Sequence, residues 1–362
     1  MNIAFVTVFG FFLVVVAVLL VLVVRFTFQR TSAERRRWLA ETSQGRTGSD
    51  DHAGDPEPAH QKTALVLGGG GTRGAAQVGM LAVLAEVGFV PDAIYGSSVG
   101  AVNGAAFAGD PTPQGVERLA GIWRGISGGD VYPKRRVHGP WQFLQQRESI
   151  HPNAGLLQII EEGIGYDRLE DAAVPLEVVA TSMTDGRERW FVTGPAVKAV
   201  LASAAIPAIF PPVVIDGDRL IDGGVVDNVP ISRAIDAGAT RIVVLLCGPP
   251  TYTPAPTKRP VEALLNALFI SIHARFSREM AGLPDGVEVI VCSGGDTMSR
   301  DYTDFSTTEA LIAHGRAEAT EVVRRHGVGR PSEEAGGVIG NRVDGSPSAP
   351  RGTTELGQLP AG

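Results

Sequence analysis

The stretch TALVLGGGGTRG, residues 63–74, sets a short apolar strand directly before a run of glycines. Residues 75–87 after it have the pattern of a helix. Glycine turns let backbone N–H groups point into a cavity without obstruction by a Cβ atom, and the N-terminus of the next helix adds positive potential. The unit therefore predicts an α/β fold with a loop suited to a phosphate, a pyrophosphate or a transition-state oxyanion.

The glycines of this loop also satisfy a dinucleotide-binding fingerprint, with Gly69, Gly71 and Gly74 at the required spacing. That fingerprint is a weak signal alone, and it needs an acidic residue about 20 residues further on. Gly96 stands there instead, and no Gly-Lys-Ser/Thr sequence follows the loop. A nucleotide P-loop is therefore excluded, and a dinucleotide-dependent enzyme is disfavoured.

A second glycine-flanked turn follows the apolar residues 92–95. It reads Gly96-Ser97-Ser98-Val99-Gly100, a G-x-S-x-G sequence ahead of an Ala-rich helix. A nucleophile elbow needs small residues two places before and after its serine, because the chain turns too sharply there for larger side chains. The central Ser98 is the candidate nucleophile, and an ordinary tight turn with a capping serine is the alternative.

A third turn supplies a carboxylate. Asp222-Gly223-Gly224 follows the apolar pair Leu220-Ile221, so a short strand would deliver Asp222 to the edge of a cavity. Alone, such a sequence could also be a simple hairpin turn, which is the structure expected for Asp216-Gly217-Asp218.

Apolar strand-like segments alternate with helix-like ones along the chain, which indicates a largely parallel sheet covered on both faces. The two cysteines, Cys247 and Cys292, each end an apolar run and are expected to be buried. Two cysteines cannot form a disulfide scaffold or a structural zinc site. The further strands are expected at residues 176–181, 189–193, 241–247 and 287–292, and the helices at 195–204, 261–281 and 306–326.

Taken in order, these motifs resemble the patatin-like phospholipase family, which has a glycine-rich oxyanion loop, a G-x-S-x-G serine and an Asp-Gly-Gly/Ala turn. A fourth segment, ASAAIPAIFPP at residues 202–212, is similar to the stretch that precedes the aspartate in that family, and residues 304–315 are a weaker match to its closing helix. The resemblance covers about residues 63–326. It implies a three-layer α/β fold with a central, mostly parallel sheet, in a hydrolase domain at residues 62–328.

The resemblance also implies a Ser–Asp dyad. Ser98 would attack an ester carbonyl and Asp222 would accept its proton, which requires a largely desolvated carboxylate with a raised pKa. The loop glycines would stabilise the oxyanion, Arg73 would brace the loop, and no cofactor or metal is implied. The expected site residues are Ser98 and Asp222, the loop residues Gly69, Gly70, Gly71, Arg73 and Gly74, the elbow residues Gly96 and Gly100, and the turn residues Gly223 and Gly224.

Two other functions remain open at this stage. A Ser-Asp-His hydrolase of the ordinary α/β type is compatible with chain order, because His273, His314 and His326 follow Asp222. The first two lie in helical patterns rather than in a strand-end loop, which disfavours that reading. A non-catalytic membrane scaffold is the other alternative, and the intact serine, aspartate and glycine loop argue against it.

The chain begins with a 22-residue apolar run, residues 3–24, which is interrupted only by Thr7 and Gly10. A helix of that length spans about 33 Å, enough for a bilayer core of about 30 Å. Five arginines against one glutamate at residues 25–37 predict that the following side is cytoplasmic. We therefore expect a single-pass anchor in the cell membrane at residues 1–25, a basic juxtamembrane segment and flexible linker at 26–61, a cytoplasmic catalytic domain, and a disordered tail at 329–362.

The formal net charge of −7 argues against a general nucleic-acid binder. A hydrolase domain tethered beside a bilayer points instead to membrane lipids as substrates, namely the fatty-acyl esters of phospholipids or lysophospholipids. Residues 127–153 interrupt the strand–helix rhythm and predict either a flap or an ordinary surface insertion. The oligomeric state is not predicted.

Overall fold

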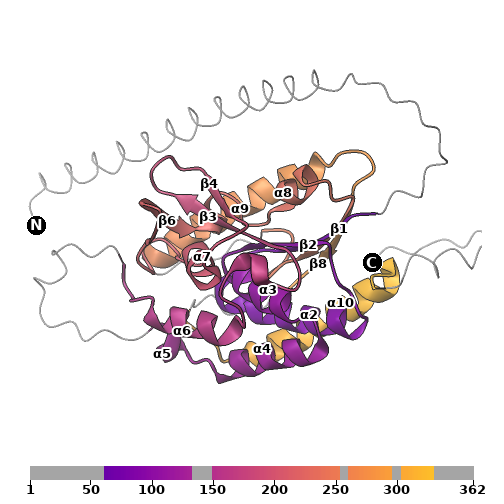
Figure 1. The fold of residues 1–362 in the computed structure, drawn as a ribbon, viewed down its shortest axis with the longest axis horizontal. Helices are drawn as coiled ribbons and strands as arrows, with labels where there is room; N and C mark the ends of the chain where they lie inside the picture. The colour runs from indigo at the N-terminus through magenta and orange to yellow at the C-terminus, as the bar shows by residue number, and fades with distance from the viewer. Residues whose placement is uncertain (1–60, 133–148, 253–259, 296–302, 330–362) are drawn as a thin grey trace, which may run out of the picture. The chain divides into compact units, whose positions relative to one another are not determined.

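The computed structural model describes residues 61–132, 149–252, 260–295 and 303–329 (Figure 1). The chain divides into two compact units, residues 1–59 and 60–362, and every described residue belongs to the second. The predicted anchor, nearly all of the linker, the tail and the middle of the 127–153 segment lie outside the described residues. Within the described ranges, no helix combines the length and apolarity needed to cross a membrane.

Eight strands form one mixed sheet in the described residues, in the order β5-β6-β3-β2-β1-β7-β8, with β4 also paired to β3. The five strands from β3 to β8 along this order run parallel, whereas β4, β5 and β6 are joined by antiparallel pairings. The strands are β1 (Thr63–Leu67), β2 (Ala93–Ser97), β3 (Leu176–Ser182), β4 (Glu188–Phe191), β5 (Val213–Ile215), β6 (Asp218–Asp222), β7 (Arg241–Leu245) and β8 (Glu288–Cys292).

Helices cover both faces of this sheet (Figure 1). Alternate residues of β1 show the two layers, because Leu65 and Leu67 join one buried cluster and Ala64 and Val66 join another. The first cluster contains side chains of α2 (Ala75–Glu86), α3 (Val99–Gly109), α4 (Pro113–Gly125), α6 (Ala154–Gly163), α7 (Ala196–Ser203) and α10 (Thr308–His326). The second contains those of α8 (Ile231–Asp236) and α9 (Pro260–Ala281).

The expected strands and helices are confirmed, and the sheet is more mixed than the sequence pattern predicted. The difference arises in residues 176–222, where short turns join β3 to β4 and β5 to β6 as antiparallel hairpins, and where β6 also pairs antiparallel with β3. Asp216 (φ 51°) and Gly217 (φ 81°) form the two-residue turn of the β5–β6 hairpin, as expected for that sequence. Both cysteines are buried free thiols, as predicted, and burial raises the pKa of each to about 12.

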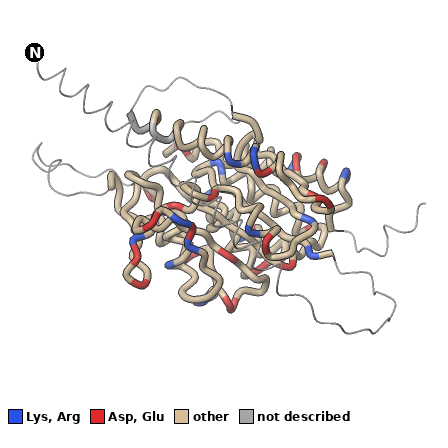
Figure 2. The backbone as a smooth tube through the Cα atoms, turned by 90° about the horizontal axis from the view of Figure 1, so that it is seen from above, with Lys and Arg blue, Asp and Glu red and all other residues tan. Residues whose placement is uncertain are grey.

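Two glycines let α2 and α10 pack with their backbones in contact. A Cβ atom on Gly79 would lie 1.9 Å from the carbonyl oxygen of Ile312, and one on Gly315 would lie 1.9 Å from that of Ala76. An ion pair between Glu86 and Arg316 (2.6 Å) joins the same two helices. Both residues of this ion pair are about half exposed, so the pair contributes little to stability compared with the glycine contact. Charges of both signs are spread along the described backbone (Figure 2).

Replacing Gly79 by Ala is expected to destabilise the fold by about 1–3 kcal/mol, because the added methyl group forces the two helices apart. Gly121 in α4 is the matched control, since no atom lies within 4 Å of the position its Cβ would take. Gly121→Ala should stabilise by about 0.5–1 kcal/mol through helix propensity. Urea unfolding of both variants measures the difference, and equal midpoints would contradict the close contact.

Candidate active site

Ser98 occupies a strained turn between β2 and α3. Its backbone has φ 54° and ψ −128°, a conformation that residues with a side chain rarely adopt. The glycines two places away permit the turn, because a Cβ on Gly100 would lie 2.2 Å from the carbonyl oxygen of Leu67 and one on Gly96 would lie 2.7 Å from the Cα of Ala101. The G-x-S-x-G motif is thus placed at a strand–helix elbow, as the sequence predicted.

Asp222 reaches this serine from the other half of the sheet. Strand β3 is paired with β2 through Val179 and Ser97, and with β6 through Ala180 and Asp222. Because β2 runs parallel and β6 antiparallel to β3, the C-terminal ends of β2 and β6 lie at the same level on the two sides of β3. The Oγ–H of Ser98 donates to Oδ2 of Asp222 over 2.6 Å.

The carboxylate of Asp222 is buried, with only 5% of the residue exposed. Burial raises the pKa of Asp222 to about 6, although hydrogen bonds from the Ser98 hydroxyl and the Gly224 N–H lower it. The latter bond runs from the Gly224 N–H to Oδ1 over 2.7 Å. The motif predicted a desolvated aspartate with a raised pKa, and Asp222 has both properties.

The Gly-Gly turn after Asp222 is fixed by close backbone approaches. A Cβ on Gly223 would lie 2.3 Å from the carbonyl oxygen of Val179, and one on Gly224 would lie 2.5 Å from Oδ1 of Asn228. Both glycines therefore have a steric role in presenting the carboxylate.

The glycine loop passes directly over Ser98. A Cβ on Gly69 would lie 2.9 Å from the Cβ of Ser98. The N–H of Gly69 already donates to the carbonyl of Asn228 (3.1 Å), whereas the described residues supply no backbone acceptor for the N–H groups of Gly70 and Gly71. The N–H groups of Gly70 and Gly71 are therefore available to a substrate oxygen, whereas the Gly69 N–H is occupied.

Arg73 lies beside this loop rather than in the cavity. Its Nε donates to the carbonyl of Gly70 at 3.5 Å, and its guanidinium stands 4.9 Å from the centre of the Phe269 ring on α9. These contacts suit the bracing role expected for Arg73. Gly74 allows the loop to approach α3, because its Cβ would lie 2.4 Å from a methyl group of Val99.

One short segment at the end of α7 holds both the serine and the aspartate. The hydroxyl of Ser203 accepts the N–H of Ser98 (2.9 Å), and the carbonyl of Ala205 accepts the N–H of Asp222 (2.9 Å). Sequence reasoning included these residues in the 202–212 motif without giving them a role. Since its N–H is occupied by Ser203, Ser98 does not donate to an oxyanion through its own backbone.

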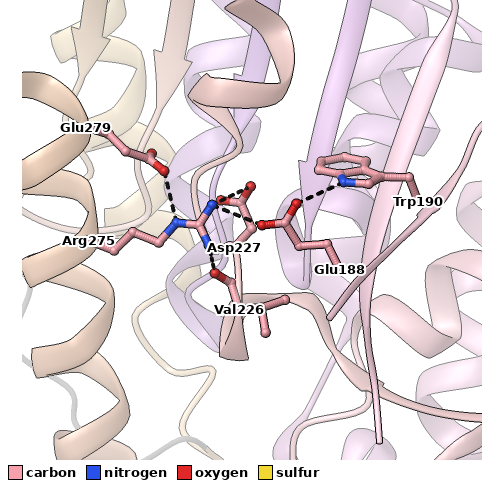
Figure 3. A network of polar contacts seen from close by, with 6 residues as sticks. All are labelled: Glu188, Trp190, Val226, Asp227, Arg275 and Glu279. Atoms are coloured by element: carbon pink, nitrogen blue, oxygen red, sulfur yellow. Dashed lines mark hydrogen bonds and ion pairs between the residues drawn. The ribbon is translucent and has the colours of Figure 1, made fainter. Parts of the chain in front are cut away.

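Arg275 forms a second brace, which contacts the residues that follow the Asp222 turn and was not predicted from the sequence (Figure 3). Arg275 of α9 donates to the carbonyl of Val226 and pairs with the buried carboxylate of Asp227 over 3.1 Å. The same guanidinium contacts Glu188 (3.1 Å) and Glu279 (2.9 Å). Arg275 thereby anchors the chain between the Asp222 turn and Asn228, which bonds to the glycine loop.

An apolar pocket opens beside Ser98, with an empty space of about 650 Å³ including its open mouth. Ser98, Gly71 and Thr72 lie at its polar end. Apart from these and Gly163, its walls are aliphatic and aromatic: Val99, Val102, Leu119, Ile122, Trp123, Ile126, Val131, Tyr132, Leu156, Ile159, Ala204, Ile206, Phe210 and Phe305. Such a lining favours a hydrocarbon chain attached to a polar group.

Of the described histidines, His151 packs edge-on against the pocket residue Tyr132, with the ring centres 5.4 Å apart, and the other three lie in α9 and α10. His273 is within α9 and contacts the carbonyls of Phe269 and Pro249, while His314 lies within α10 and His326 ends that helix. Among the described residues, neither a histidine bond to Ser98 or Asp222 nor a cluster suited to a metal ion is present.

The chain is similar in sequence to a lysophospholipase and to an NTE family protein. Lysophospholipase NTE1 of Cryptococcus neoformans is 32% identical over 197 residues, which are 52% of this chain and 11% of that protein. An uncharacterised NTE family protein of Mycobacterium tuberculosis is 29% identical over 217 residues, 59% of this chain and 58% of that protein. The chain therefore spans less than two thirds of the length of these relatives.

Among solved structures, VipD from Legionella pneumophila aligns with a TM-score of 0.41 and 15% identity, covering 79% of this chain and 73% of VipD. The sequence model of the family described as patatin-like phospholipase matches residues 65–235. That range contains the glycine loop, the Ser98 elbow and the Asp222 turn, so residues 65–235 of this chain form a patatin-like phospholipase domain.

Proposed function

We propose that the domain is a serine acyl hydrolase that cleaves fatty-acyl esters of membrane phospholipids or lysophospholipids with Ser98 and Asp222. The observation that carries the proposal is the 2.6 Å hydrogen bond between these two side chains, located where an apolar pocket meets a glycine loop. Within the described residues, the Ser98 hydroxyl donates to Asp222, and the other carboxylate oxygen of Asp222 accepts the Gly224 N–H.

The geometry supports a two-step reaction. In the first step Ser98 Oγ forms a bond to the ester carbonyl carbon while its proton passes to Asp222. The N–H groups of Gly70 and Gly71 stabilise the oxyanion, and the leaving alcohol takes the proton from Asp222 as the C–O bond breaks. In the second step a water molecule gives its proton to Asp222 and attacks the acyl-enzyme, after which Ser98 regains a proton and the fatty acid leaves.

The pocket and the relatives support the proposed substrate class. The aliphatic and aromatic walls suit an acyl chain, and the first-named relative is a lysophospholipase. An anchor at residues 1–25, with the domain on the cytoplasmic side, would hold the site beside bilayer lipids. We therefore include the lipid substrate, the membrane anchor and the cytoplasmic location of the domain in the proposal.

Replacing Ser98 by Ala is expected to lower kcat by a factor of at least about 10³, because the acyl-enzyme cannot form. A fluorophosphonate probe should label the wild-type chain and not this variant. Ser97→Ala is the matched control: Ser97 is buried and adjacent in sequence, and its variant should retain labelling. Release of fatty acid from vesicles of phosphatidylcholine and lysophosphatidylcholine measures turnover, and its absence with both lipids would contradict the proposed substrate class.

The acidic limb of kcat/KM is expected near pH 6, because Asp222 must be ionised to accept the proton and burial raises its pKa to about 6. Activity is therefore lost as the pH falls through this value. A pH–rate profile on a soluble ester measures the limb, and one near pH 4 would contradict a desolvated base.

The raised pKa of Asp222 favours the folded state at low pH, where activity is lost. Because burial raises the pKa of Asp222 to about 6 in the folded chain, its contribution to stability is fully present below about pH 4 and is lost as the pH rises through about 6. Relative to Asp222→Asn, the wild-type chain should lose on the order of 3 kcal/mol of unfolding free energy between those limits. Urea unfolding at several pH values measures this difference, and curves that stay parallel would argue against the shifted pKa.

Alanine substitution of each histidine in the domain is expected to leave kcat within about threefold of the wild type, since the dyad uses no imidazole. The variants are His138→Ala, His151→Ala, His273→Ala, His314→Ala and His326→Ala. A folded histidine variant as inactive as Ser98→Ala would establish a triad in place of the dyad. Thermal unfolding of each variant confirms that it is folded.

A further inference from the structure

A chain of buried side-chain amides lies behind the glycine loop. Gln77 of α2 and Asn103 of α3 are both fully buried, and Nδ2 of Asn103 donates to Oε1 of Gln77 over 2.9 Å. Trp123 of α4 continues the chain, because its Nε1–H donates to Oδ1 of Asn103 over 2.9 Å. Three helices thus contribute one side chain each to a single polar line through an apolar core.

The remaining donors of this chain end on the glycine loop and its neighbouring strand. Nε2 of Gln77 donates to the carbonyls of Gly68 (2.8 Å) and Leu245 (2.9 Å). Nδ2 of Asn103 donates its other hydrogen to the carbonyl of Gly74 (3.0 Å). The two amides therefore hold both ends of the loop that carries Gly70 and Gly71.

Every amide hydrogen and each amide oxygen of Gln77 and Asn103 has a partner in this arrangement. A buried polar network that is fully satisfied rigidifies the structure around it, whereas the loss of one member leaves an unpaired group in a low-dielectric interior. Such a network suits a loop whose N–H groups must be held in place before reaction.

Trp123 connects this network to the pocket. Its ring is part of the pocket wall, and it also touches the loop, because a Cβ on Gly74 would lie 3.1 Å from Cη2 of the indole. Phe305, another wall residue, packs against the indole with the ring centres 6.2 Å apart. One indole therefore contacts the pocket with its ring and the network with its N–H.

We infer that Gln77, Asn103 and Trp123 form a positioning unit that holds the Gly70 and Gly71 N–H groups for the oxyanion, in addition to the role of Trp123 as pocket wall. The inference rests on the proposed acyl hydrolase function. A positioning unit acts on the chemical step with every acyl group, whereas a wall residue acts on the binding of those chains that reach it. Loss of the positioning role should therefore lower kcat, whereas loss of the wall role should raise KM.

The decisive variant is Trp123→Phe, which keeps an aromatic wall and removes the N–H donor. Its kcat is expected to fall about tenfold with both p-nitrophenyl acetate and p-nitrophenyl decanoate, less than the 10²–10³ lost when an oxyanion donor itself is removed. Leu156→Ala is the matched control: Leu156 lines the same pocket, and no hydrogen bond joins its side chain to the network. This comparison variant should raise KM for the decanoate by a larger factor than it lowers kcat for either ester.

Gln77→Met provides a second variant, because it keeps the side-chain length and removes both donors together with the oxygen that accepts from Asn103. The carbonyls that it leaves have other partners: the N–H of Gly68 donates to Leu245, and the thiol of Cys247 lies 3.3 Å from the oxygen of Gly68. This variant is expected to fold, which thermal unfolding checks, and to show the same kcat loss with both esters.

Three outcomes decide the inference. A kcat loss shared by Trp123→Phe and Gln77→Met with both esters supports it. A change confined to KM for the decanoate, or full kcat in a folded Gln77→Met, overturns it while the hydrolase function stands. An inactive wild-type chain would overturn the proposed function, and this inference with it.

Discussion

The site depends on one buried carboxylate placed beside a strained serine. A carboxylate out of water is unfavourable unless hydrogen bonds replace its solvent, and Asp222 has two such bonds, from the Ser98 hydroxyl and the Gly224 N–H. Ser98 can supply its bond only from a backbone conformation that the elbow imposes. The segment at Ser203 and Ala205, the Gly223–Gly224 turn and the Arg275 brace all act to keep these two groups at their separation.

Close backbone approaches are the second constraint, and glycine makes each of them possible. The same device recurs at Gly69 over the serine, at Gly100 against β1 and at Gly79 and Gly315 between helices. In each case a methyl group would fall within 3 Å of another atom. The high glycine content of the domain thus has a local steric reason at these positions.

The motifs were predictable from sequence because each is a local pattern with a local cause. The elbow glycines, the strand before Asp222 and the glycine loop follow from turn sterics acting within a few residues. The contacts that lock the motifs together were not predictable in this way, because Ser203, Asn228 and Arg275 act on residues more than 40 positions away. A usable signal did exist for Gln77 and Asn103, since each is the one amide in a helix otherwise built from apolar and small residues, apart from the terminal Glu86 of α2. The antiparallel pairing of β6 with β3 was not predictable, because α7 separates the two strands in the chain and no short turn fixes their relative direction.

The pairing of β2 and β6 on the two sides of β3 has a consequence for how this chain can change. Ser98 and Asp222 are 124 positions apart, yet their separation is set by strand register across Val179 and Ala180. The length of the connections between these strands does not enter that register. Surface segments between these strands can therefore gain or lose residues without moving the two side chains. A one-residue shift in the register of β3 would instead change its pairing with both β2 and β6.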